Sequence, residues 1–276
     1  MIARLTGAVL RGLLVVLLIA TPSLILPTVP AETAQIVAFV AIAGLFLTML
    51  EYGSSAPCLF EFRDAAPFNR IRFSAIMLLL VLVSLVVRHN LAPTGLSAFV
   101  WSVGHVVGNA LDFPFSPMRL ALPVLPETAT FQAYDTLVSA FGLALLVLVI
   151  ALCLFVVDLH RDNWPRRGTF NVWINLPTFD PTRCGDVVSR LDRDGRINIF
   201  AGIAMPAVLP MVFGPNSALI SAVSLEQPQA MVWAVAVWLG LPFSLIMRGL
   251  AMQRIAQLIE VRRKDATNPR VGLVPL

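Results

Sequence analysis

Charged residues are scarce in this chain of 276 residues, at 13% of the total. A soluble domain usually carries about a quarter of charged residues, so much of the surface of this protein does not face water. The positive charge is almost all arginine, with Lys264 as the single lysine, and it lies at the ends of apolar stretches. A membrane protein needs positive residues at those places, so we expect no nucleic-acid partner.

The residues that build most catalytic and metal sites are also few. The three cysteines, Cys58, Cys153 and Cys184, form no CxxC pair and no disulfide framework. The three histidines, His89, His105 and His160, lie outside the apolar stretches. Haem held across a helix bundle requires histidines that face each other inside the membrane. The sequence has no nucleophile elbow, phosphate-binding loop, zinc signature or dinucleotide fingerprint. We therefore expect no catalytic residues, no cofactor and no metal site.

Long apolar runs are what the chain has in abundance, with 58% hydrophobic residues. A spanning helix needs about 20 mostly apolar residues, and continuous rather than alternating runs favour helices over a barrel. The predicted fold is an all-α, polytopic helical membrane protein in one domain, with short amphipathic helices at the interfaces. The sequence predicts about six transmembrane helices, at residues 8–26, 33–50, 71–87, 136–157, 197–213 and 231–250.

The positions of arginine and lysine predict the orientation. With the N-terminus in the cytoplasm, only Arg88 and Arg119 lie on the outer side, and the other eighteen of the 20 arginines and lysines lie on the inner side. Positive residues gather in cytoplasmic loops, so we expect both termini inside. An alternative concerns residues 1–31, where Arg4, Arg11, a short apolar core and "TVPA" are also compatible with a cleaved signal peptide.

An elbow of aromatic and charged residues, "APCLFEFRDAAPFNRIRF" at 56–73, follows the second predicted span. We expect aromatic side chains there at the acyl boundary and arginines on lipid phosphates: Phe60, Phe62, Arg63, Arg70 and Arg72. Glu61 and Asp64 are expected to pair with these nearby arginines. The alternative is a docking face for a partner subunit, because exposed aromatics and arginines also suit interfaces.

The inner loop, 158–196, is the largest polar region. We expect Arg166, Arg167 and Arg190 to contact anionic lipid headgroups or a partner there. Within this loop, Asp180 suits a helix N-cap and Gly195 a helix stop, which predicts a short amphipathic helix on the cytoplasmic surface.

On the outer side, residues 97–112 have the period of an amphipathic helix. Its predicted polar stripe is Ser102, His105, Asn109 and Asp112. At about 16 residues the segment is short for a span, so we place it on the outer surface or in a re-entrant hairpin. The stripe then faces the headgroup layer or lines a vestibule. The GxxxG pair in this segment allows close helix packing, although a lone match is weak.

The fifth predicted span contains Pro206 and Pro210, which remove backbone donors and kink a helix. We consider them as a hinge, as in the broken helices of transporters, or as static kinks. No Asp, Glu, His or Lys lies near the centre of a predicted span. Because charge movement across a membrane needs such residues, an ion-driven pump is disfavoured.

Three functions remain open. The first is a non-enzymatic accessory, scaffold or assembly subunit of a membrane complex, with the lipid bilayer, anionic lipids and other membrane subunits as partners. The second is a channel or transporter for an uncharged or lipidic small molecule, and the third is a membrane enzyme acting on lipid headgroups. The arginine-rich, lysine-poor composition suggests a GC-rich bacterium and therefore the inner (plasma) membrane.

Overall fold

The computed structural model describes residues 2–54, 59–126, 128–161, 164, 171–180, 182, 185–212, 225 and 227–267. These residues form helices and no strand. The helices are α1 Ile2–Ile25, α2 Ala31–Gly53, α3 Phe68–His89, α4 Gly95–Ala110, α5 Pro117–Ala121, the short 3₁₀ helix η1 Leu122–Val124, α6 Phe131–His160, α7 Val172–Asn175, α8 Val187–Val212 and α10 Pro228–Thr267. The predicted all-α fold is confirmed.

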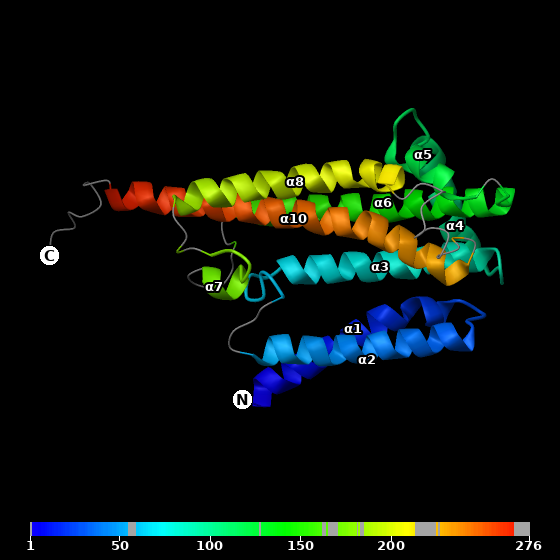
Figure 1. The fold of residues 1–276 in the computed structure, drawn as a ribbon, viewed down its shortest axis with the longest axis horizontal. Helices are drawn as coiled ribbons and strands as arrows, with labels where there is room; N and C mark the ends of the chain where they lie inside the picture. Colours follow the sequence, from blue (N-terminus) through cyan, green and yellow to red (C-terminus); the bar gives the residue numbers. More distant parts are fainter. Residues whose placement is uncertain are drawn as a thin grey trace.

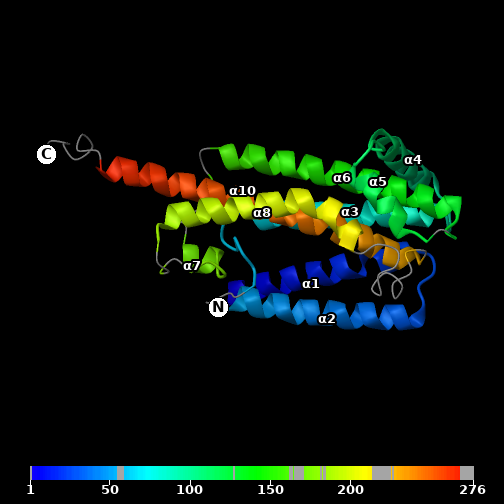
Figure 2. The same cartoon turned by 45° about the horizontal axis from the view of Figure 1, so that its top comes forward.

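The six longest helices of the described residues run alternately up and down one elongated bundle (Figures 1 and 2). α1, α3 and α8 run in one direction, and α2, α6 and α10 run in the other. The first residues of α1 and the last residues of α10 consequently lie toward the same end of the molecule, which we call the terminal end. The elbow and α7 also lie there, whereas α4 and α5 lie at the opposite end.

Five helices are long and apolar enough to cross a membrane among the described residues: Leu5–Ile25, Ala31–Gly53, Phe68–His89, Phe131–His160 and Pro228–Asp265. They correspond to five of the six predicted spans and make the protein a multi-pass membrane protein. The last helix is longer than predicted. Its 40 residues correspond to about 60 Å at 1.5 Å per residue, so it continues past the bundle at the terminal end (Figure 1).

The remaining predicted span, 197–213, is the fifth along the chain; it coincides with α8 up to Val212, and α8 is not among those five helices. The first turns of α8 are charged because the predicted cytoplasmic surface helix does not stop at Gly195. It continues without a break into the apolar residues of the predicted span. The helix begins after Asp186, whose carboxylate accepts the Ser189 N–H at 3.1 Å. The hydrogen bond from Arg263 is the main cause that lowers the pKa of Asp186, which keeps this cap ionised. Membrane crossing by α8 remains a prediction.

Close contact with α10 explains why Gly195 does not end the helix. A Cβ on Gly195 would lie 3.0 Å from the Gly249 carbonyl oxygen, and one on Gly202 would lie 2.7 Å from that of Pro242. Glycine therefore serves at both positions to bring two backbones together. The expectation of a helix stop at Gly195, and of an N-cap at Asp180, was wrong.

The predicted outer segment 97–112 forms α4, which starts with a capping box between Thr94 and Ser97. Gly104 and Gly108 are buried against α6, where a Cβ on Gly142 would lie 2.6 Å from the Gly108 Cα. The GxxxG pair is therefore a real packing motif, and α4 is tucked against α6 and α3 rather than lying free on the surface.

The bundle has two parts. α1 and α2 form a hairpin that packs mainly through α1 against α3, with a small contact to α10, whereas α3, α4, α6, α8 and α10 pack closely together as a body. α1 diverges from α3 toward its own N-terminus, which leaves a wedge between the hairpin and the body (Figure 1).

Candidate functional site

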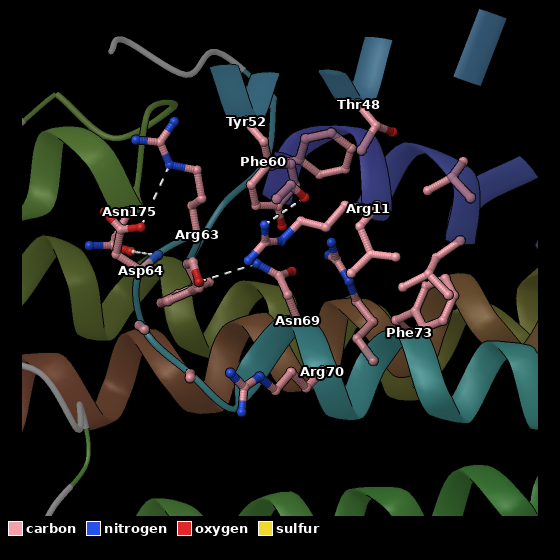
Figure 3. A pocket seen from close by; sticks show the side chains of 18 of the residues that line it. Arg11, Thr48, Tyr52, Phe60, Arg63, Asp64, Asn69, Arg70, Phe73 and Asn175 are labelled. Atoms are coloured by element: carbon pink, nitrogen blue, oxygen red, sulfur yellow. Dashed lines mark hydrogen bonds and ion pairs between the residues drawn. The ribbon is translucent and has the colours of Figure 1, made fainter. Parts of the chain in front are cut away.

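A cavity of about 940 Å³ lies in this wedge, near the terminal end. A cavity of this volume is large enough for a small-molecule or lipid ligand. Its wall combines α1, the end of α2, the elbow, the start of α3, α7 and one residue of α10 (Figure 3). The lining residues include Leu10, Arg11, Leu14, Val15, Leu18, Tyr52, Arg63, Asp64, Asn69, Arg70, Arg72 and Asn175.

Hydrogen bonds also fasten the hairpin to the body at the end opposite the cavity. Gln229 Nε2 donates to Ser23 Oγ at 2.9 Å, and Arg88 Nη1 donates to the Ile25 carbonyl at 2.7 Å. Thr21 Oγ1 also lies 3.4 Å from Met77 Sδ. These contacts come from α10 and α3, so both neighbours of α1 hold the hairpin there.

The polarity of the cavity changes along its length. Leu14, Val15 and Leu18 of α1 and Ile76 of α3 form an apolar wall toward the middle of the bundle. Arginines from three segments form the wall toward the terminal end: Arg11 from α1, Arg63 from the elbow, and Arg70 and Arg72 from α3. The cavity is therefore amphipathic in the same sense as a lipid in one leaflet.

Arg11 and Tyr52 meet at this polar end. The Arg11 guanidinium lies 4.6 Å from the centre of the Tyr52 ring, and its Nη1 donates to the Gly7 carbonyl at 2.8 Å. A guanidinium over an aromatic face is attracted electrostatically but remains charged and keeps donors free. Asn69 lies beside Arg11 in Figure 3, and its Nδ2 donates to the elbow carbonyls of Glu61 at 2.8 Å and Phe62 at 3.2 Å.

Arg63 closes the end of α2 rather than facing lipid. Its Nη1 donates to the carbonyls of Glu51 at 3.0 Å and Ser54 at 2.8 Å, and its Nε lies 3.7 Å from Asp64 Oδ1. The last carbonyls of a helix lack intrahelical partners and favour a cation. Arg63 thus joins the elbow to the hairpin and forms a fixed part of the cavity wall.

Phe62 is not at a lipid boundary, which corrects the expectation for this residue. It is fully buried, with its ring 4.4 Å from that of Phe68 and its N–H donating to the Asn175 carbonyl at 2.7 Å. Phe60 is half-buried 5.6 Å from the Tyr52 ring. The elbow folds inward because α7 supplies the hydrogen-bond partners that its backbone needs.

Arg70 and Arg72 begin α3. Arg70 is exposed at the cavity rim, while Arg72 is half-buried with its guanidinium 5.3 Å from the Phe68 ring. Arg190 is outside the cavity lining, since it stacks 4.7 Å over Phe179 and donates to the Asp180 carbonyl at 2.8 Å. Arg166 and Arg167 lie outside the described residues.

The predicted outer stripe lies at the opposite end of the bundle and does not contribute to the cavity. His105 Nδ1 lies 2.8 Å from Asp135 Oδ1, and its ring stacks 4.9 Å from that of Trp101. Asp112 pairs with Arg119 at 3.4 Å. Ser102 and Asn109 are exposed.

The two prolines considered as a hinge lie inside a continuous α8. Pro210 has no N–H to donate to the carbonyl four residues earlier, and that carbonyl belongs to Pro206. Trp238 Nε1 of α10 donates to it at 3.0 Å instead. The kink position is thus fastened to α10 by a side chain.

Sequence reasoning gave Arg11 only a topological role and missed Tyr52 and Asn175 as parts of a site. The sequence did contain a signal for Arg11 and Tyr52, because both residues lie at the same end of two adjacent predicted helices that are joined by a short turn. Comparison with protein-family models, curated proteins and solved structures found no match to this chain.

Proposed function

We propose that this chain is a non-enzymatic accessory protein of the bacterial inner membrane that holds a membrane lipid in its wedge cavity. The observation that carries this proposal is the polarity of the cavity, with leucines and valine along α1 and arginines at the terminal end. A lipid with its headgroup toward the terminal end and its acyl chain along α1 matches both walls. By the positive-inside rule, we expect that end to face the cytosol.

The accessory role rests on how the hairpin is exposed. α2 keeps large apolar side chains on its outward face, among them Ile36, Phe39, Phe46 and Leu50. In a membrane such a face contacts acyl chains or another helix. A lipid bound between this hairpin and the body would fix the position in which the hairpin contacts a neighbouring subunit.

Lipid retention tests the proposal. The protein is purified in mild detergent, and native mass spectrometry then counts bound lipids. We expect about one retained lipid per chain. Leu14→Trp narrows the apolar part of the cavity and is expected to lower retention, whereas Leu13→Trp is the matched control, because Leu13 is exposed and does not line the cavity. Equal retention in the two variants, or none in the parent protein, would overturn the proposal.

Transport of a lipidic molecule is the second candidate. It is favoured by the geometry of the wedge, because α1 diverges from α3 toward the terminal end while the far end of the hairpin is fastened to α3 and α10. Reconstitution into liposomes with a fluorescent lipid separates the two candidates. An accessory protein leaves the lipid distribution between leaflets unchanged, and a transporter equilibrates it.

A further inference from the structure

The charge of the cavity specifies its ligand further, on the basis of the lipid-binding function proposed above. Four arginines line the cavity, and among the described lining residues the single carboxylate is Asp64. Two more carboxylates lie nearby, but both have partners. The Glu51 side chain accepts the N–H groups of Leu59 at 3.1 Å and Phe60 at 3.3 Å. The Glu61 side chain is held by Arg248.

Three of the arginines therefore lack a carboxylate partner within the part of the chain that the structure describes. Arg11 contacts a carbonyl and a ring, Arg72 contacts a ring, and the guanidinium of Arg70 makes no hydrogen bond or ion pair there. Burying a guanidinium without an anionic partner is costly, and this applies most to the half-buried Arg72, whereas Arg70 is exposed. The lining residues together with Arg248, Glu51 and Glu61 contain five arginines and three carboxylates, so the net charge around the cavity is +2.

We propose that the cavity selects an anionic phospholipid whose headgroup phosphate carries close to two negative charges, and that Arg11 and Arg72 bind this phosphate. The planar fork of a guanidinium donates two parallel hydrogen bonds to phosphate oxygens. A phosphomonoester carries about −1.5 to −2 charges at pH 7, which matches the net charge around the cavity. Tyr52 lies against Arg11 and presents its ring as a wall beside the headgroup.

The apolar wall of the cavity favours a lipid over a soluble phosphate compound as the ligand. Leu14, Val15 and Leu18 of α1 line the cavity beyond the arginines, and a soluble ligand would leave this surface uncovered. Each buried CH₂ group contributes about 0.8 kcal/mol, so an acyl chain adds strongly to the binding. The same phosphate without acyl chains should therefore bind far more weakly.

The test uses the delipidated full chain in detergent and three lipids with identical acyl chains: phosphatidic acid, phosphatidylglycerol and phosphatidylcholine. Native mass spectrometry of the equimolar mixture measures the bound fractions. We expect the order phosphatidic acid, phosphatidylglycerol, phosphatidylcholine, with about tenfold between the first and the last. Glycerol 3-phosphate, in excess, should not displace phosphatidic acid.

The variant Arg11→Gln/Arg72→Gln should bring the three lipids close to parity while about one lipid stays bound. Arg262→Gln is the control, because Arg262 is exposed on α10 and outside the cavity lining. Arg11→Lys keeps the charge and should retain part of the preference, and an unchanged elution volume shows that each variant is folded. Parity in the parent protein, a preference for phosphatidylglycerol, or displacement by glycerol 3-phosphate would overturn this inference but leave the proposed function standing. Absence of any bound lipid would overturn both.

Discussion

Arg248 of α10 holds both carboxylate oxygens of Glu61, a residue of the elbow 187 positions earlier in the chain. Nε lies 2.6 Å from Oε2, and Nη2 lies 2.9 Å from Oε1. Arg248 also donates to Asn198 of α8 at 2.9 Å and to Thr178 of the inner loop at 3.1 Å. One guanidinium thus connects four segments at the terminal end, directly behind the wall of the cavity.

Removing the charge of Glu61 should destabilise the protein. The two side chains are 12% and 26% exposed, and the loss of one partner leaves a mostly buried guanidinium without its anion. We expect Glu61→Gln to lower the free energy of unfolding by about 2–3 kcal/mol, measured by thermal unfolding in detergent. Asp192→Asn is the control, since it breaks an exposed pair with Arg196 and should cost at most about 1 kcal/mol. Equal effects would contradict the structural role of Arg248.

The residues around Arg248 show where prediction from the sequence succeeded and where it failed. Hydropathy and arginine positions predict the long helices, because apolar length and charged ends are local properties of the chain. The partner of Glu61 was expected among Arg63, Arg70 and Arg72, because those residues are neighbours in sequence. The structure instead turns the elbow inward through Phe62 and Asn175, and such long-range pairing leaves no local pattern.

The same distinction holds for the cavity. Sequence reasoning placed Arg70 and Arg72 at the terminal end, where they line the cavity. It did not find the wedge itself, because the divergence of α1 from α3 depends on the contacts of Ser23 and Ile25 with distant residues. Glycines gave a mixed result, since Gly104 and Gly108 have a recognisable spacing whereas Gly195 was taken for a helix stop.

The packing of α4 on α6 predicts a strong effect of a single methyl group. A Cβ on Gly142 would lie 2.6 Å from the Gly108 Cα and 2.8 Å from the Gly104 carbonyl oxygen, so the two helices must separate. We expect Gly142→Ala to destabilise the protein by about 1–3 kcal/mol, seen as a lower thermal midpoint. Gly53→Ala is the matched control, because its Cβ would meet nothing within 4 Å. A Gly142→Ala protein as stable as this control would show that α4 is not held by this contact.

The hydrogen bond between Trp238 and Pro206 predicts that a second substitution, Pro210→Ala, restores the stability lost in Trp238→Phe. Trp238→Phe keeps an aromatic ring close to Phe141 but leaves the Pro206 carbonyl without its donor, which should cost about 1–3 kcal/mol. Pro210→Ala restores a backbone N–H four residues after Pro206. In the Trp238→Phe background it should therefore recover stability, whereas it should have less effect in the parent protein. Additive effects of the two substitutions on the unfolding midpoint would show that the two donors do not replace each other.

Whether α8 crosses the membrane is tested by finding on which side of the membrane three positions lie. Thr128 precedes α6, Gln227 precedes α10, and Arg262 lies near the end of α10; all three are exposed. Each is replaced by cysteine in a protein whose native Cys58, Cys153 and Cys184 are serine. Because the helices alternate in direction, a membrane-impermeant maleimide applied to intact cells should label Thr128→Cys and Gln227→Cys. Arg262→Cys should react only after permeabilisation. Protection of Gln227→Cys together with labelling of Arg262→Cys would mean that α8 does not cross, and the reverse pattern at all three positions would invert the orientation.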